Sequence, residues 1–124
     1  MGSARKAFGD YFKDLRIARG KTLRRFCLEN GFDASNLSKM ERGLLAPPPH
    51  ETLEKYAKCL DIEEGSKEWY TLFDLAAAAR GEIPSDILSD EELVAKLPLV
   101  FRTVRGEKVP RDQLDQLIEV IRGA

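Results

Sequence analysis

Apolar positions in the first third of the chain recur with the spacing of short amphipathic helices. The first helix is predicted from one apolar face, formed by Phe8, Tyr11, Phe12, Leu15 and Ala18. A second, short helix follows the N-cap residue Thr22, and a third spans residues 34 to 42 behind the N-cap residue Asp33. The third helix turns Leu37 and Met40 inward and its small and polar residues outward.

Prolines and capping residues divide the rest of the chain into further helices. Three consecutive prolines, Pro47 to Pro49, remove backbone donors and predict a loop. Helices are then expected from about Glu51 to Leu60 and from about Ser66 to Arg80, the latter with a stripe from Trp69 to Ala76.

The last third is predicted to be helical as well. A Ser-x-x-Glu capping box at Ser89 starts a helix that runs to Leu97, and Pro98 interrupts or restarts it through Val104. A turn over residues 106 to 109 precedes a last helix from Pro110 to about Arg122. No strand pattern is present, so we expect an all-α protein with one domain over residues 1 to 64 and a helical C-terminal module over residues 65 to 124.

Composition and charge narrow the functional classes. The chain has 124 residues and 43% apolar content, which is typical of a folded protein. No run approaches the roughly 18 apolar residues of a membrane helix, and the N-terminus lacks a signal-peptide core, so we expect a cytoplasmic protein without a membrane partner. Residues 1 to 60 carry 12 basic and 7 acidic side chains (+5), whereas residues 61 to 124 carry 8 and 14 (−6). This split favours a half that faces a polyanion.

The residues that most often carry catalysis or bind metals are few and isolated. Cys27 and Cys59 lack the paired spacing of a zinc or redox site, and we interpret both as buried apolar side chains. His50 is the only histidine and stands next to the prolines without a nucleophile or a second ligand in the sequence pattern. We therefore expect neither an enzyme, nor a metal site, nor a cofactor.

Residues 8 to 62 resemble the Cro and phage-repressor type of helix-turn-helix regulators, the XRE family. The resemblance is carried by Phe8-Gly9 with Phe12, Leu15 and Arg16, by Thr22 with Phe26-Cys27, by the run Leu37-Ser38-Lys39-Met40-Glu41-Arg42-Gly43, and by Glu51-Thr52-Leu53 with Ala57 and Leu60-Asp61-Ile62. It implies a five-helix DNA-binding domain of the phage-repressor type. In such folds one helix enters the major groove of double-stranded DNA.

The resemblance also implies roles for individual residues. Arg16 and Glu41 match an ion pair that links the first helix to the recognition helix; the alternative is two independent surface charges. The base-reading positions correspond to Ala34, Ser35, Ser38 and Lys39. Lys39 has the donors to bind O6 or N7 of guanine. The alternative for this face is a solvated polar surface.

Phosphate contacts are expected around the same helices. The candidates are Thr22, Arg24, Arg25, Asn36 and Arg42, with Lys6 and Lys21 as further basic residues. For any one of the basic residues an ordinary exposed charge is an equally good interpretation. The chain departs from the family at Leu23, where a phosphate-binding glutamine is common, and the triple proline lengthens the loop after the third helix.

The C-terminal module is expected to pair two chains, because one domain of this size contacts a single half-site. The candidate interface residues are Trp69, Phe73, Leu114, Leu117, Ile118 and Ile121, which would otherwise form an intramolecular core. The hypothesis is a dimeric transcriptional repressor of its own operon. The alternative is an antitoxin or adaptor whose acidic C-terminal half binds a basic protein partner such as a toxin.

Overall fold

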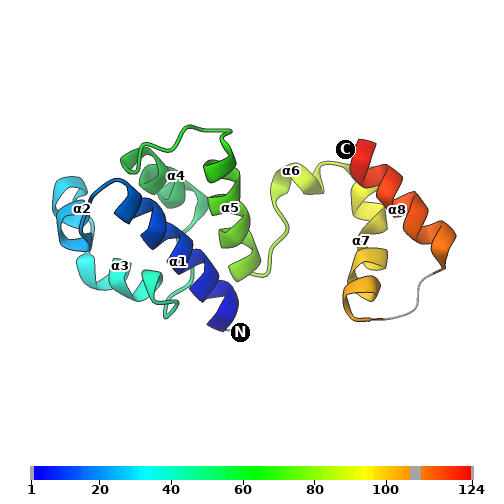
Figure 1. Cartoon of the computed structure of the whole chain (residues 1–124), viewed down its shortest axis with the longest axis horizontal. Helices are drawn as coiled ribbons and strands as arrows, with labels where there is room; N and C mark the ends of the chain where they lie inside the picture. The colour runs from blue at the N-terminus through cyan, green and yellow to red at the C-terminus, as the bar shows by residue number, and fades with distance from the viewer. Residues whose placement is uncertain (1, 107–109, 124) are drawn as a thin grey trace. The chain divides into compact units, whose positions relative to one another are not determined.

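All the regular structure that the computed structural model describes is helical (Figure 1). The description covers residues 2 to 106 and 110 to 123, without the side chains of residues 2, 3, 85, 117 and 120 to 123. In these ranges the elements are α1 (Gly2–Ala18), α2 (Leu23–Asn30), α3 (Ala34–Glu41), α4 (His50–Cys59), α5 (Lys67–Ala79), α6 (Ser85–Leu88), α7 (Glu91–Val104) and α8 (Arg111–Gly123). The all-α expectation is confirmed, whereas the turn expected over residues 106 to 109 lies largely outside the described residues.

Side-chain caps fix where α2, α3 and α5 begin. The hydroxyl of Thr22 accepts a hydrogen bond from the backbone N–H of Arg25 at 3.1 Å, and the carboxylate of Asp33 accepts one from Asn36 at 3.0 Å. Ser66 caps α5 in the same way. Each cap satisfies a backbone donor that the first turn of a helix leaves free. The three starts predicted from the sequence are thereby confirmed.

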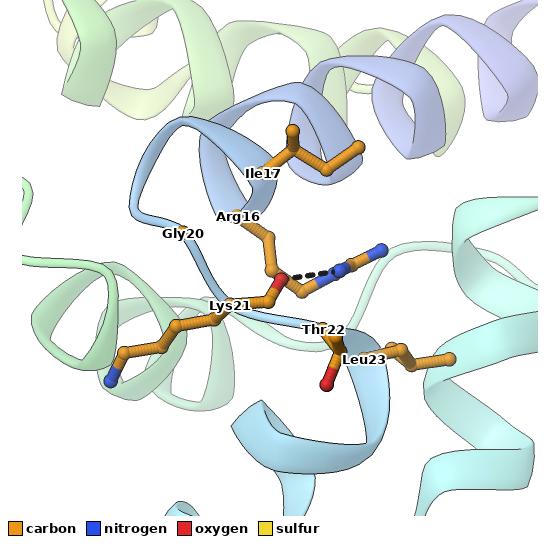
Figure 2. Close-up of a pocket in the computed structure, with 6 residues that line it drawn as sticks. All are labelled: Arg16, Ile17, Gly20, Lys21, Thr22 and Leu23. Carbon is orange, nitrogen blue, oxygen red and sulfur yellow. Dashed lines mark hydrogen bonds between the residues drawn. The ribbon is translucent and has the colours of Figure 1, made fainter.

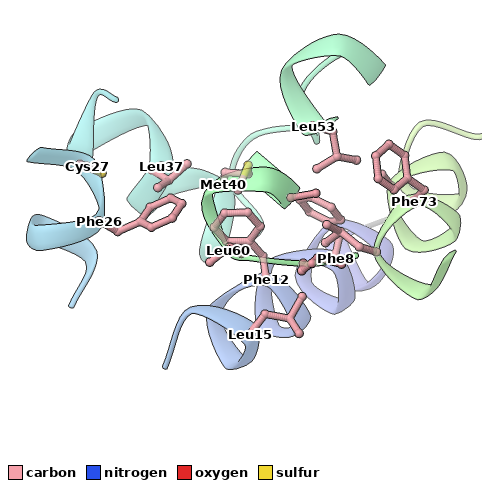
Figure 3. Packing of buried hydrophobic residues seen from close by; sticks show 14 residues of the cluster. Phe8, Phe12, Leu15, Phe26, Cys27, Leu37, Met40, Leu53, Leu60 and Phe73 are labelled. Carbon is pink, nitrogen blue, oxygen red and sulfur yellow. The ribbon is translucent and has the colours of Figure 1, made fainter. Parts of the chain in front are cut away.

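The chain divides into two compact units, and the core of the first, residues 1 to 82, is built around α1 (Figure 3). Phe8 and Phe12 are fully buried, and the Phe12 ring meets Phe26 of α2 and Tyr56 of α4 edge-on, with centroid distances of 6.0 and 5.6 Å. The other large side chains that are fully buried here are Phe26, Leu37, Leu53, Leu60 and Leu72. Burial of so many apolar side chains from five helices holds α2 and α3 in fixed positions on this scaffold.

A glycine allows α1 to approach the end of α3 closely. A Cβ atom placed on Gly9 would lie 2.3 Å from the carbonyl oxygen of Glu41 and 2.6 Å from that of Met40. These distances are far shorter than the 3.3 to 3.6 Å, roughly, at which carbon and carbonyl oxygen normally meet. Only a residue without a side chain fits at position 9, so the contact sets the spacing between α1 and α3.

The first compact unit extends through Glu82, whereas the sequence analysis expects a domain boundary at residue 64. The stripe of α5 is not free for a second core, because Leu72, Phe73 and Ala76 are buried in the same cluster as α1. The packing of α5 on α1 is the most extensive between any two elements in the described ranges. A periodic stripe shows that a helix is buried on one side, but it does not show against what.

The second unit, residues 83 to 124, contains α6, α7 and α8. Asp90, not Ser89, caps α7 by accepting a hydrogen bond from the backbone N–H of Leu93 at 3.0 Å, while the Ser89 hydroxyl donates to the carbonyl of Asp86. The helix then continues through Pro98 instead of being interrupted there. Pro98 is exposed, so water can bond the carbonyl that the missing proline N–H leaves without a donor.

Candidate nucleic-acid interface

Helix α3 has one buried side and one exposed side. Leu37, Met40 and Glu41 are buried, with at most 5% of each residue exposed. The predicted base-reading residues Ala34, Ser35 and Lys39 are exposed, together with Asn36, and Ser38 is half-buried at the edge. The outward face therefore brings together donors, acceptors, a methyl group and one positive charge, which are the groups that read base edges.

A buried ion pair joins this helix to α1. Arg16 donates from Nε to one carboxylate oxygen of Glu41 at 2.8 Å and from Nη2 to the other at 2.9 Å. Its Nη1 donates to the carbonyl oxygen of Lys21 at 2.7 Å, in the turn before α2. Because the hydrogen bonds that Arg16 donates to Glu41 favour the charged guanidinium, the pKa of Arg16 is raised above its usual range. One guanidinium thus connects α1, α3 and the turn that leads into α2.

The basic side chains on α2 and in the turn before it differ in whether they form ion pairs. Arg25 donates to the carboxylate of Glu29 at 2.6 Å, and Lys21 donates to the same carboxylate at 2.8 Å. These two hydrogen bonds hold the pKa of Glu29 below its usual range. Arg24 is exposed and forms no ion pair with a described residue. Among the α2 candidates, Arg24 is therefore the cation most readily available to a phosphate, whereas Arg25 has to leave Glu29.

A shallow hollow of about 420 Å³ lies where α1 ends and α2 begins (Figure 2). Its lining residues are Arg16, Ile17, Gly20, Lys21, Thr22 and Leu23. The first turn of α2 has free backbone N–H groups at this place, and the positive end of the helix dipole points the same way. Leu23 adds an apolar side chain where a glutamine would offer an amide, so any phosphate here depends on backbone donors and neighbouring cations.

The remaining phosphate candidates, Arg42 and Asn36, lie at the two ends of α3. Arg42 is exposed, and its Nε donates to the carbonyl of Ser38 at 3.3 Å. A residue far away in the sequence holds the proline loop in place: Nη1 of Arg80 donates a hydrogen bond to the carbonyl oxygen of Pro48 at 2.5 Å. Nothing in the local sequence pattern predicted this contact between residues 32 positions apart. Asn36 lies on the first turn of α3, and its backbone N–H donates to the Asp33 cap.

The candidates for a chain-pairing interface are divided between the two units. Trp69 stacks on Phe73 at a centroid distance of 4.2 Å, and Phe73 is buried, so both belong to the first unit. In the second unit Leu114 is half-buried and Ile118 is 45% exposed. The side chains of Leu117 and Ile121 lie outside the described residues.

Several observations within the described ranges concern metal-ligating, membrane-spanning and reactive side chains. No group of three or more metal-ligating side chains comes together there. None of the helices in that part of the chain has the length and apolar character to cross a membrane. Burial raises the pKa of the thiols of Cys27 and Cys59, which lowers their reactivity. Nε2 of His50 lies 2.8 Å from a carboxylate oxygen of Glu54, and the centroid of its ring lies 4.9 Å from that of Phe73.

Sequence reasoning missed two features of this site. Glu29, which engages Lys21 and Arg25, could have been found from the four-residue spacing of Arg25 and Glu29 on one helix. The close approach at Gly9 could not, because nothing in a helical pattern marks a glycine as a contact point.

Comparison with protein-family models, curated proteins and solved structures finds no match to this chain. The XRE resemblance therefore stays a prediction that only experiments on this chain can test.

Proposed function

We propose that the chain is a sequence-specific double-stranded DNA-binding regulator of the helix-turn-helix type. The observation that carries the proposal is the exposed face of α3, with Ser35, Asn36 and Lys39 turned outward on a helix whose other side is anchored in the core. A major groove about 12 Å wide admits one helix of this kind. On this model Lys39 and Ser35 contact base edges, and Ala34 offers a methyl contact to thymine.

The surroundings of α3 support the same proposal. The first sixty residues carry a net charge of +5, and Arg24, Asn36 and Arg42 are exposed on or next to α2 and α3. Contacts from such groups to phosphates fix the register of a protein on a duplex, whereas base contacts give specificity. The Arg16–Glu41 pair would hold the reading helix at a fixed angle to this cationic surface.

The test begins with selection of bound duplexes from a random pool at a stated salt concentration. Binding to the selected duplex is then measured by fluorescence anisotropy for the wild type, Lys39→Ala and Arg24→Ala. Lys39→Ala should weaken binding by about 1 to 3 kcal/mol at one base pair and relax specificity there. Arg24→Ala should weaken all duplexes alike and reduce the slope of log K against log salt by about 0.9.

Lys55→Ala serves as the matched control, because Lys55 is an exposed lysine on α4, outside α2 and α3. Its affinity and salt slope should equal those of the wild type. The proposal fails if the random pool yields no enriched sequence, or if Lys39→Ala and Arg24→Ala bind the selected duplex as tightly as the control.

The alternative function, an antitoxin or adaptor with an acidic C-terminal half, receives less support from the unit boundaries. Residues 61 to 82 carry 2 basic and 6 acidic side chains (−4), and they belong to the first unit. Residues 83 to 124 carry 6 basic and 8 acidic ones (−2), so the two parts account for the −6 of this half. The second unit by itself is therefore nearly balanced in charge and is no strong attractor for a basic partner.

A further inference from the structure

The carboxylate of Glu29 is held by two cations at the same time. Arg25 donates from Nε to Oε1 of Glu29 at 2.6 Å, and Lys21 donates from Nζ to Oε2 at 2.8 Å. Each carboxylate oxygen therefore accepts from a different side chain. Arg25 lies on α2, whereas Lys21 lies in the turn before it. We call the Lys21, Arg25 and Glu29 side chains together the Glu29 clamp.

The anion in the Glu29 clamp has the binding features of a phosphodiester. A carboxylate and a phosphodiester each carry a single negative charge, which is shared by two equivalent oxygens on one central atom. Arginine and lysine bind phosphates in proteins through the same charge-assisted hydrogen bonds that they form with carboxylates. A phosphate of a DNA backbone therefore matches the place that the Glu29 carboxylate takes between the two cations.

The Glu29 clamp is open to a large ligand and lies beside other groups that attract anions. The side chain of Arg25 is 67% exposed and that of Glu29 is 36% exposed, so both are reached from solvent. Lys21 lines the hollow at the start of α2, where the positive end of the helix dipole favours negative charge. Arg24, the neighbour of Arg25, is exposed as well.

Glu29 competes with an incoming phosphate for both cations. It is ionised at neutral pH, because the hydrogen bonds from Lys21 and Arg25 keep its pKa below its usual range. The Glu29 clamp therefore has a net charge of +1, whereas its two cations alone carry +2. Ion pairs that are exposed to solvent are weak, so a polyanion of high charge density can open this one. The carboxylate still weakens whatever phosphate contact replaces it.

We propose that Glu29 is an internal competitor for DNA phosphates, which occupies the phosphate site of Lys21 and Arg25 in the free chain and so limits the affinity for every duplex. The inference rests on the proposed function, because it states how one phosphate site of that function is regulated. Phosphate contacts carry no direct sequence information. Glu29 therefore lowers the affinity for specific and non-specific duplexes alike, and keeps non-specific binding weak.

The test is Glu29→Gln, which keeps the shape of the side chain and removes its charge. Fluorescence anisotropy measures the affinity for the selected duplex and for a duplex of scrambled sequence at several salt concentrations. The variant should bind both duplexes more tightly than the wild type, with a slope of log K against log salt that is steeper by about 0.9. Its advantage should therefore shrink about eightfold for each tenfold rise in salt concentration.

Two controls separate competition from a general effect of net charge. Glu54→Gln removes the same charge from an exposed glutamate that lies next to a side chain four residues away, but on α4, and it should bind both duplexes as the wild type does. In a protein that carries Lys21→Gln and Arg25→Gln, adding Glu29→Gln should lose most of its effect, because no clamp is left to release. A gain of equal size in either control, or no gain from Glu29→Gln in a chain that binds DNA, would overturn the inference.

A measurement without DNA distinguishes failure of this inference from failure of the proposed function. Inorganic phosphate is titrated into the ¹⁵N-labelled wild type and the Glu29→Gln variant, and the NMR signal of the Arg25 Nε–H group is followed. Phosphate should shift this signal at lower concentrations in Glu29→Gln than in the wild type. If neither protein binds any duplex, the proposed function fails. Equal phosphate responses of the two proteins would refute the competition by Glu29, whatever the duplexes show.

Discussion

Replacing Gly9 by alanine should destabilise the first unit, although alanine is the better helix former. The new Cβ would lie 2.3 Å from one backbone carbonyl oxygen of α3 and 2.6 Å from another, about 1 Å closer than normal contact. Neither oxygen can rotate away, because both belong to the backbone. Overpacking of this kind costs about 1 to 3 kcal/mol, and the upper end applies to a contact with rigid atoms.

The opposing effect is a gain of about 1 kcal/mol, since alanine in a helix is favoured over glycine by that amount. The net expectation is a loss of about 2 kcal/mol, or a fall of roughly 10 °C in Tm for a unit of this size. Differential scanning calorimetry measures the change. Ala7→Gly, an exposed position in the same helix, calibrates the helix-propensity contribution. A Gly9→Ala protein that melts at or above the wild-type temperature would show that α1 and α3 are not in close contact.

Three further predictions concern the same unit. Glu41→Ala should cost about 3 kcal/mol in urea denaturation, because it leaves the buried guanidinium of Arg16 without its carboxylate; a change below 1 kcal/mol would mean that the pair is solvated. Lys21 and Arg25 lower the pKa of Glu29 in the folded protein, so the ionised Glu29 stabilises the fold fully above the ordinary glutamate pKa of 4.5. This stabilisation is lost as the pH falls through the lower pKa of the folded state. Glu29→Gln should abolish this contribution to the pH dependence of stability, and an unchanged stability profile would contradict the prediction. A fragment of residues 1 to 82 should unfold cooperatively on heating, whereas a fragment of residues 1 to 64 should not, since it lacks the buried side chains of α5; equal cooperativity of the two would refute the unit boundary.

Local chemistry made most of the first unit predictable. Thr22, Asp33 and Ser66 are short polar residues in front of apolar periodic segments, and each accepts the expected backbone hydrogen bond. The same periodicity placed Leu37 and Met40 inside and Ser35 and Lys39 outside on α3. These signals act within one turn of helix, so one sequence is enough to find them.

Contacts between distant residues were harder to predict. The Arg16–Glu41 pair is present, but only the family resemblance indicated it, because charge type and spacing across 25 residues do not specify a partner. The position of α5 against α1 was missed since its stripe fits any apolar neighbour. The continuation of α7 through Pro98 was missed, because the sequence shows the low helix propensity of proline but not the surroundings that tolerate it.

The place of α5 in the core has a consequence for synthesis of the chain. A ribosome releases α1 first, but the apolar face of α1 has no complete cover until α5, which ends at Ala79, has also emerged. Until α5 has been made, the nascent chain therefore lacks the part of the apolar cover of α1 that Leu72, Phe73 and Ala76 provide. A pause in synthesis before α5 has emerged from the ribosome would prolong this exposure, whereas a later pause would not.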